Sequence, residues 1–232
     1  AMHLHETAWE IEASLQAHGR RPLARLAGLG LASPQLIAIH MTQADAGDLD
    51  TLAECGASVV HCPESNLKLG SGVCPVAQLL GRGVRVALGT DGAASNNDLD
   101  LLAEARIAGL VSSGMAATPG GLVAADLLRM ATLEGARTLG LGEVTGSLEP
   151  GKWADLCCID LHAARSWPVH DPVTAVIYAA SSQQVTDTWV AGRQLLADRH
   201  LRCLDESAVL ARAEAWRKRL DATAAEEASA DD

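Results

Sequence analysis

Short apolar runs alternate with longer amphipathic stretches over the first part of the chain. Each run is rich in aliphatic or β-branched residues and is followed by a segment of helical periodicity, which is the pattern of parallel βα units. The predicted strands are 1–5, 36–41, 57–61 and 84–88, and the predicted helices are 7–18, 22–28, 45–55 and 75–80. Four such units amount to half of an eight-stranded α/β barrel.

The pattern changes near Gly146. Before this glycine, segments of helical periodicity separated by Gly and Pro residues predict helices on the outside of the barrel, at 99–111, 121–131 and 135–139. After it, 156–160 and 185–190 predict strands of a small β-rich module, and 206–220 predicts an amphipathic helix. We therefore divide the chain into a half barrel at 1–145, a β module at 146–203, a helix at 204–220 and a disordered Ala-rich, acidic tail at 221–232.

The composition is that of a globular protein, since 48% of the 232 residues are hydrophobic. Acidic residues outnumber basic ones by 29 to 18, and the basic residues are scattered, which argues against a nucleic acid partner. The six cysteines include no Cys-x-x-Cys pair, so we expect buried free thiols in a reducing compartment. No apolar run is long enough to cross a bilayer and no leader is evident, so we expect a cytoplasmic protein without a membrane partner.

Polar residues that can bind a metal or move protons stand at the ends of the predicted strands. The first strand ends with His3 and Glu6, and the second ends with His40. The third leads into Ser65-Asn66-Leu67-Lys68, and the fourth ends with Asp91. The carboxyl ends of barrel strands converge on one face. The sequence therefore predicts imidazole and carboxylate groups around one mouth, suited to a divalent metal and a proton shuttle.

The first strand offers two ways to bind a metal. His3 and His5 lie two residues apart and face the same way, so they could bind one ion together. We favour His3 as the ligand, with Glu6 as an adjacent general acid and base. His5 is then expected to pack in the core or to make a hydrogen bond.

Structural roles are the alternatives for the other two strand ends. Asp91 closes an apolar strand and precedes Gly92, where it could cap the following helix, but Asp98 is also available for that cap. A lone strand histidine such as His40 is more often a buried core residue. Its functional interpretation depends on the agreement of its neighbours.

These motifs together resemble the amidohydrolase superfamily, and above all its methylthioadenosine/S-adenosylhomocysteine deaminases. The resemblance lies in His3-Leu4-His5-Glu6-Thr7, His40, Ser65-Asn66-Leu67-Lys68-Leu69-Gly70 and Gly89-Thr90-Asp91-Gly92-Ala93-Ala94-Ser95-Asn96-Asn97. Gly146 to Asp160 resembles the segment that returns from the barrel to a small composite β domain. The implied fold is the C-terminal half of a (β/α)8 metal-dependent hydrolase barrel plus part of that β domain.

The resemblance implies a role for each strand-end residue. His3 resembles the metal-binding histidine of the fifth barrel strand, and Glu6 the carboxylate that moves protons and touches the purine. His40 resembles the sixth-strand histidine beside the attacking water, and Asp91 the eighth-strand aspartate that binds metal and water. The implied site comprises the metal ligands His3 and Asp91, the catalytic residues Glu6, His40 and Asp91, and the substrate-binding residues Glu6, Ser65, Asn66, Lys68 and Asp91.

The implied function is hydrolytic deamination of an adenosine-like purine nucleoside with one divalent ion, Zn²⁺ or, as an alternative, Fe²⁺, in a homo-oligomeric full-length enzyme. Within the superfamily the alternatives are an s-triazine hydrolase or a guanine-type deaminase, and outside it a non-catalytic assembly module. The family pattern also requires a His-x-His motif on the first barrel strand. His3-Leu4-His5 does not supply it, because Glu6-Thr7 follows directly and only four strands lead to Asp91, so the resemblance places it on the fifth strand. We therefore expect a fragment of a longer enzyme that, alone, binds metal weakly and is inactive.

Overall fold

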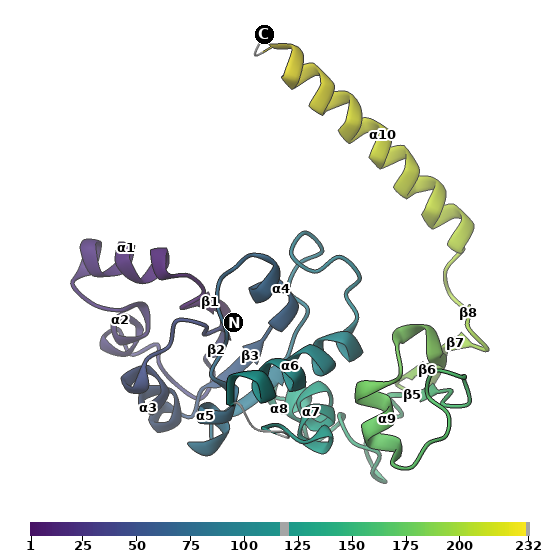
Figure 1. Ribbon diagram of the computed structural model, residues 1–232, viewed down its shortest axis with the longest axis horizontal. Coiled ribbons are helices and arrows are strands. Elements are labelled where there is room, and N and C mark those ends of the chain that lie inside the picture. Colours follow the sequence, from purple (N-terminus) through teal and green to yellow (C-terminus); the bar gives the residue numbers. More distant parts are fainter. Residues whose placement is uncertain (117–120, 231–232) are drawn as a thin grey trace.

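Four parallel strands form the first sheet of the computed structural model, which describes residues 1–116 and 121–230, with side chains as far as 223 (Figure 1). The strands are β1 (Met2–Leu4), β2 (Ile37–His40), β3 (Ser58–His61) and β4 (Arg85–Leu88), and they pair in the order of the sequence. Met2 lies opposite Ala38, and Ser58 lies opposite both Ile37 and Arg85. All four carboxyl ends therefore lie at one edge of the sheet.

The helices that accompany this sheet (Figure 1) are α1 (Ala8–His18), α2 (Pro22–Gly28), α3 (Ala46–Cys55), α4 (Pro63–Lys68), α5 (Val76–Gly81), α6 (Leu101–Ala116), α7 (Ala124–Ala131) and α8 (Leu133–Thr138). Side chains of α2, α3, α5, α6 and α7 form the core with one face of the sheet. On the covered face Ala38, Val59 and Val86 are fully buried. Ile39 and Val60, on the opposite face, are only half-buried. The helix-covered face therefore holds the strands in register, and the other face corresponds to the inside of a barrel.

Capping groups fix where the helices begin and end. Thr7 accepts the Glu10 amide at the start of α1, and Gly19 ends that helix in the left-handed conformation with φ of 66°. Asp45 and Asp48 form a reciprocal capping box at the start of α3. These signals are local, so the sequence pattern locates both helices closely.

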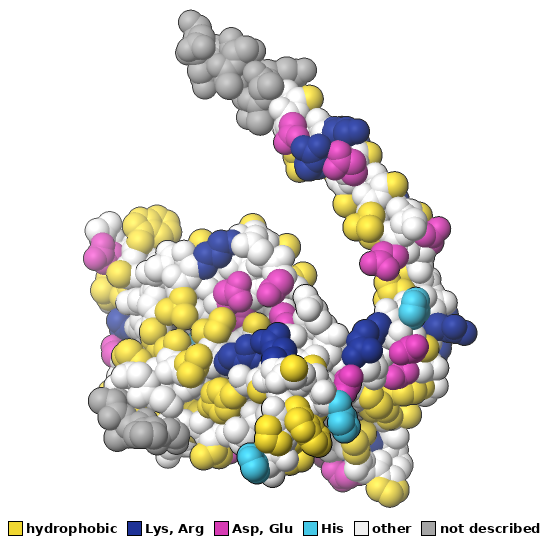
Figure 2. All heavy atoms as spheres, turned by 45° about the vertical axis from the view of Figure 1, so that its right-hand side comes forward, with side chains coloured by type: hydrophobic (Ala, Val, Ile, Leu, Met, Phe, Trp, Pro, Cys, Tyr) yellow, Lys and Arg dark blue, Asp and Glu magenta, His cyan; other side chains and the backbone are white. Residues whose placement is uncertain are grey.

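A second, antiparallel sheet forms a small module after the helices. Its strands, paired in sequence order, are β5 (Leu156–Ile159), β6 (Val185–Val190), β7 (Arg193–Ala197) and β8 (His200–Leu201), accompanied by helix α9 (Pro172–Tyr178) and the 3-10 turn η1 (Ser182–Gln184). Helix α10 (Glu206–Ala230) extends away from this module (Figure 1). Hydrophobic side chains lie exposed along it in Figure 2, among them Val209, Trp216 and Leu220.

The half barrel predicted from the sequence is confirmed, and several details differ. Helices α4 and α9 and strands β7 and β8 were not predicted from the hydrophobic pattern. Helix α10 passes the predicted end at Leu220 and occupies most of the segment expected to be disordered, where Ala and Glu are strong helix formers. Cys62 and Cys74 are buried, but the expectation of buried thiols is wrong for the exposed Cys157, Cys158 and Cys203. No helix among the described residues is long and apolar enough to cross a membrane.

Asp48 connects three elements beneath the site. Its carboxylate accepts hydrogen bonds from Nε and Nη2 of Arg21 at 3.0 and 2.6 Å and lies 3.2 Å from Nδ1 of the buried His5. His5 Nε2 in turn accepts the Leu23 amide at 3.0 Å, so His5 makes a structural hydrogen bond, as predicted. Burial alone would raise the pKa of Asp48, but the hydrogen bonds from His5 and Arg21 outweigh it and hold that pKa well below its usual range.

We expect Asp48→Ala to lower the free energy of unfolding by about 3 kcal/mol, because Arg21 and His5 lose their buried partner. Urea denaturation of the full-length protein measures this change. Because the folded pKa of Asp48 is depressed, its contribution is present above the unfolded aspartate pKa of about 4 and is lost as the pH falls below it. The control is Asp50→Ala. Asp50 lies on α3, as Asp48 does, and its loss removes only an exposed ion pair with Arg82, which should cost under about 1 kcal/mol. Equal losses at neutral pH for the two variants would contradict the prediction.

Candidate functional site

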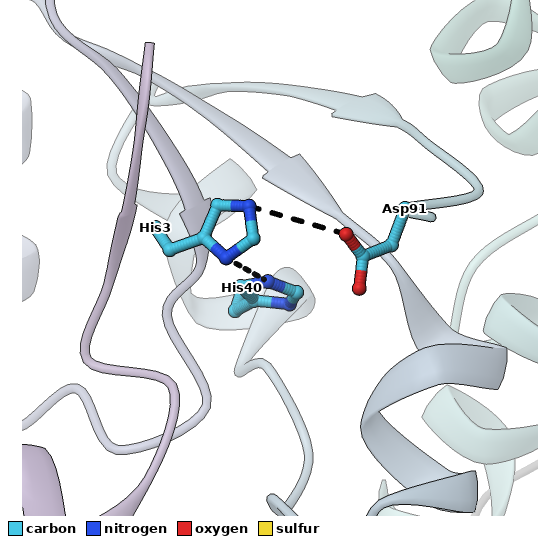
Figure 3. Close-up of side chains that lie close together, drawn as sticks. All are labelled: His3, His40 and Asp91. Atoms are coloured by element: carbon cyan, nitrogen blue, oxygen red, sulfur yellow. Dashed lines mark hydrogen bonds and ion pairs between the residues drawn. The ribbon is translucent and has the colours of Figure 1, made fainter. Parts of the chain in front are cut away.

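Three potential metal ligands meet at the carboxyl edge of the parallel sheet (Figure 3). His3 lies in β1, His40 ends β2, and Asp91 follows β4. His40 Nε2 lies 3.3 Å from His3 Nδ1, and His3 Nε2 lies 3.9 Å from Asp91 Oδ1. Each residue offers a ligand atom within 4.8 Å of the others. The parallel register thus gathers side chains from distant parts of the chain into one cluster.

The backbone at two of these positions leaves strand geometry. His40 has φ of 78° and Asp91 has φ of 61°, both in the left-handed region. Few residues other than glycine adopt this region, and the strain costs about 1–3 kcal/mol at such a site. Strict alternation along β2 would give His40 the direction of the core residue Ala38. The left-handed turn instead leaves the His40 ring edge-on to His3, with their centroids 4.6 Å apart.

A buried hydrogen bond orients the His40 ring. Its Nδ1 lies 2.8 Å from Oδ1 of Asn66, and both side chains are buried. Since an amide oxygen only accepts, Nδ1 carries the proton and donates it. The Nε2 atom is therefore the one that faces the cluster. Metal-binding histidines are held in this way by a hydrogen bond on the distal ring nitrogen.

The Asp91 carboxylate is held by two serines, Ser65 of α4 and Ser95 of the loop after β4. Ser65 Oγ and Ser95 Oγ each donate to Oδ2 at 2.7 Å. Burial alone would raise the pKa of Asp91, but these two hydrogen bonds outweigh it and keep the pKa below its ordinary value. Asp91 is therefore ionised at neutral pH. Its Oδ1 atom is the one that faces His3.

The donor set fits a divalent cation. The 3.9 Å between His3 Nε2 and Asp91 Oδ1 is too long for a hydrogen bond. It matches two ligands of one ion, because ligand bonds of about 2.0–2.2 Å keep donor atoms within about 4.4 Å of each other. Two imidazoles and a carboxylate suit Zn²⁺ and related first-row ions. His40, predicted to lie beside the attacking water, belongs to the same cluster as the two predicted ligands.

Glu6 lies beside the cluster without joining it. Its Oε2 is 3.8 Å from His3 Nδ1 and 3.7 Å from His40 Nε2, and Ser71 Oγ lies 3.5 Å from its Oε1. The Glu6 amide donates to Glu10 at 2.7 Å, which fixes the start of this segment. A carboxylate that lies beside the ligands of a metal ion, without binding the ion itself, can transfer protons to and from a substrate.

The three predicted substrate-binding residues after β3 make their hydrogen bonds within the protein. Ser65 and Asn66 are buried and orient Asp91 and His40. Lys68 Nζ donates to the Ala94 carbonyl at 2.9 Å and to Asn97 Oδ1 at 2.6 Å, so it ties the β3 loop to the β4 loop. Sequence reasoning did not single out Ser71, which follows the Ser65 to Gly70 motif, or Ser95, which lies inside the motif around Asp91.

Comparison with known proteins agrees with this geometry. The model of the amidohydrolase family matches residues 1–195. A 5-methylthioadenosine/S-adenosylhomocysteine deaminase of Teredinibacter turnerae is 48% identical over 95% of this chain and 50% of its own length. The protein of that name from Halobacterium salinarum is 44% identical over 89% of this chain and 48% of its own length. The chain thus spans about half the length of these relatives.

Solved structures share the fold described above. An adenosine deaminase from Xanthomonas campestris with bound zinc has a TM-score of 0.93 and 50% identity, over 95% of this chain and 50% of its own. The atrazine chlorohydrolase of Arthrobacter aurescens, complexed with zinc, has a TM-score of 0.87 and 29% identity, over 92% of this chain and 47% of its own. The guanine deaminase of E. coli has a TM-score of 0.77 and 26% identity, over 85% of this chain and 48% of its own. The chain matches about half of each of these structures, whose names indicate different substrates.

We expect Asn66→Ala to weaken Zn²⁺ binding by the full-length protein about 10–100-fold, because the His40 ring loses the bond that directs Nε2 toward the cluster. Competition with a chromophoric chelator measures the affinity. Gln78→Ala is the control, since it removes an exposed side-chain amide from α5. An Asn66→Ala protein that binds Zn²⁺ as tightly as the Gln78→Ala protein would show that the bond does not orient a ligand.

Proposed function

This chain belongs to the amidohydrolase family, and on that premise we propose that it supplies half of the active site of a metal-dependent deaminase of adenosine-like purine nucleosides. The observation that carries the proposal is the cluster of His3, His40 and Asp91 with the Glu6 carboxylate beside it. The names of the relatives point to methylthioadenosine and S-adenosylhomocysteine as substrates. A non-catalytic assembly module is disfavoured, because it would gain nothing from an ionised aspartate held by two serines in a strained backbone.

In this proposal each residue has a defined task. His3, His40 and Asp91 hold a divalent ion, Zn²⁺ or Fe²⁺, which supplies activation of a water molecule at neutral pH when it is bound. Asp91 Oδ1 accepts a proton from the attacking water, because Oδ2 is already engaged by Ser65 and Ser95. His40 Nε2 is left unprotonated, because Nδ1 carries the proton that Asn66 accepts, and would therefore bind the ion in this arrangement. Orientation of both groups is fixed before substrate binds, which is what electrostatic stabilisation requires.

Glu6 moves the protons that the purine needs. It donates a proton to a ring nitrogen while the water oxygen adds to the carbon that bears the amino group. Glu6, now a carboxylate, takes the remaining proton of the added hydroxyl and passes it to the amino group, which leaves as ammonia as the oxygen becomes a carbonyl. The proton that Asp91 took from the water then restores Glu6. In other zinc nucleobase deaminases a glutamate outside the ligand set has this role. The position of Glu6 beside His3 and His40 supports the assignment.

Related proteins of this fold are named for other substrates. The atrazine chlorohydrolase and the guanine deaminase share this half of the fold, but at 29% and 26% identity against 48% for the deaminase of T. turnerae. We therefore keep s-triazines and guanine as second candidates. Ser65, Asn66 and Lys68 would shape the substrate pocket mainly through the loops that they hold, and direct contacts would come from residues outside this chain.

We further propose a domain arrangement, an oligomeric state and a cellular location for the full-length protein. Residues 1–145 complete a barrel with another segment, and 146–203 form part of a composite β domain. The acidic charge and scattered basic residues support a small-molecule enzyme without a nucleic acid partner. The full-length protein is proposed to be a cytoplasmic homo-oligomer.

The full-length protein should release ammonia from methylthioadenosine, S-adenosylhomocysteine or adenosine faster than from guanine, and should not release chloride from chlorotriazines. Glu6→Gln should lower kcat about 10²–10⁴-fold, because the amide cannot carry the proton. Its Zn²⁺ affinity should stay near that of the unchanged protein, since Glu6 is not a ligand. Glu12→Gln, an exposed glutamate of α1, is the control and should leave kcat unchanged. Release of chloride with no activity toward adenosines would overturn the proposed substrate class.

A further inference from the structure

We propose that Glu104, a carboxylate buried in α6, is a positioning residue that fixes Asp91 and His40 by tying the loop after β3 to the loop after β4. Glu104 lies outside the cluster. Within the described part of the chain, it makes no hydrogen bond or ion pair with His3, His40 or Asp91. The inference deepens the proposed function, because it concerns the same site and uses the same enzyme for one of its tests.

Glu104 joins the two loops through its two oxygens. Its Oε2 accepts the backbone amide of Glu64, at the start of α4, at 3.2 Å. Its Oε1 accepts a short hydrogen bond from the side-chain amide of Asn96, in the β4 loop. The oxygen of Asn96 in turn accepts the Leu99 amide at 2.7 Å, so the loop is held on both sides of this amide. Glu104 and Asn96 are both fully buried, which makes the connection independent of solvent.

Each tether stands next in sequence to a residue that orients a ligand. Glu64 precedes Ser65 and Asn66, which hydrogen-bond to Asp91 and His40. Asn96 follows Ser95, which holds the same Asp91 oxygen as Ser65 does. The two serine hydroxyls can both lie 2.7 Å from one oxygen only if the two loops keep a fixed separation. The Glu104 carboxylate holds that separation on the buried side, and the exposed Lys68 holds it on the solvent side through Ala94 and Asn97.

The environment of Glu104 shows that this arrangement has a cost. Burial raises the pKa of Glu104 to about 7, against the lowering effect of the hydrogen bond from the Glu64 amide. The negative charges of Glu64 and Asp98 lie nearby, and none of the ion pairs of the described residues includes Glu104. An apolar side chain would fill the space without desolvating a carboxyl group. An apolar residue could not, however, accept the two N–H donors, the Glu64 amide and the Asn96 side-chain amide.

The first test is Glu104→Gln in the full-length protein, read by Zn²⁺ affinity without substrate. The glutamine side chain keeps the shape but can accept only one of the two hydrogen bonds, so one loop is released. We expect Zn²⁺ affinity to fall about 10-fold or more, as for other groups that orient metal ligands. Glu134→Gln is the matched control: this partly buried glutamate of α8 bonds Arg129 and Arg137 and lies near Arg85 at the opposite end of β4. It should leave Zn²⁺ affinity unchanged, and equal affinities for the two variants would overturn the proposal.

A double-mutant cycle distinguishes positioning from general stability. Ser65→Ala alone should weaken Zn²⁺ binding, because Asp91 loses one of its two serines. In the Glu104→Gln background the same change should have a clearly smaller effect, since residues that act through one another are not additive. Additive effects would mean that Glu104 supports folding only, and would overturn the proposal.

Hydrogen exchange supplies a readout that needs neither metal nor substrate. In Glu104→Gln the amides of Glu64 and of the 92–99 loop should exchange faster, while those of β1 and α1 keep their protection. If Glu104→Gln fails to fold, Asn96→Ala carries the same three measurements: it removes the tether to the β4 loop, together with the bond from the Leu99 amide, and leaves the bond from the Glu64 amide in place. Absence of purine deamination in the unchanged full-length protein would count against the proposed substrate, whereas unchanged loop exchange in Glu104→Gln would count against Glu104 as the tether.

Discussion

The parallel pairing of β1 to β4 is the constraint on which the site depends. It aligns the carboxyl ends of the strands at one edge, so that His3, His40 and Asp91 offer donor atoms within 4.8 Å of each other. The register is maintained by the helix-covered face, where Ala38, Val59 and Val86 are fully buried. A slip of one residue would exchange the two faces of a strand and would bring Leu4 to the position of His3. Burial of apolar side chains on one side of the sheet therefore determines the chemistry that is available at its edge.

Successive layers of hydrogen bonds act on this edge. The cluster atoms come first, the side chains of Ser65, Asn66 and Ser95 fix them, and the buried carboxylate of Glu104 joins the loops that carry those side chains. The Asp91 carboxylate shows the result, because one oxygen is fully engaged and the other is left for chemistry. The face of the sheet that corresponds to the barrel interior is open, and the His3 side chain is 56% exposed. In the proposed full-length enzyme the remainder of the barrel would cover this face.

The sequence predicts the strands and their terminal residues well, because an apolar run that ends in a histidine or an aspartate is a local signal. It also places His5 correctly, away from the cluster. It does not predict the hydrogen-bonded layers behind the cluster. Glu104 lies 40 positions from Glu64, and no local pattern marks a contact over that separation. Ser95 stands inside a recognisable motif, but its orientation toward Asp91 depends on the left-handed turn at that aspartate, which hydrophobic periodicity does not reveal.

The left-handed backbone at the strand ends narrows the choice of residues beyond what metal chemistry requires. Among residues other than glycine, asparagine, aspartate and histidine tolerate this conformation best. His5, His40 and Asp91 have φ of 52°, 78° and 61°, so at these positions the side chain that holds a cation or anchors the strand is also of a type that tolerates this conformation better than most. Met41 and Leu99 adopt it as well, so the preference is not absolute. A glutamate or a cysteine could bind zinc with suitable chemistry but would strain the turn that presents it. Backbone conformation thus acts as a second selection on this site, and it would limit any attempt to redesign the ligands for a different metal.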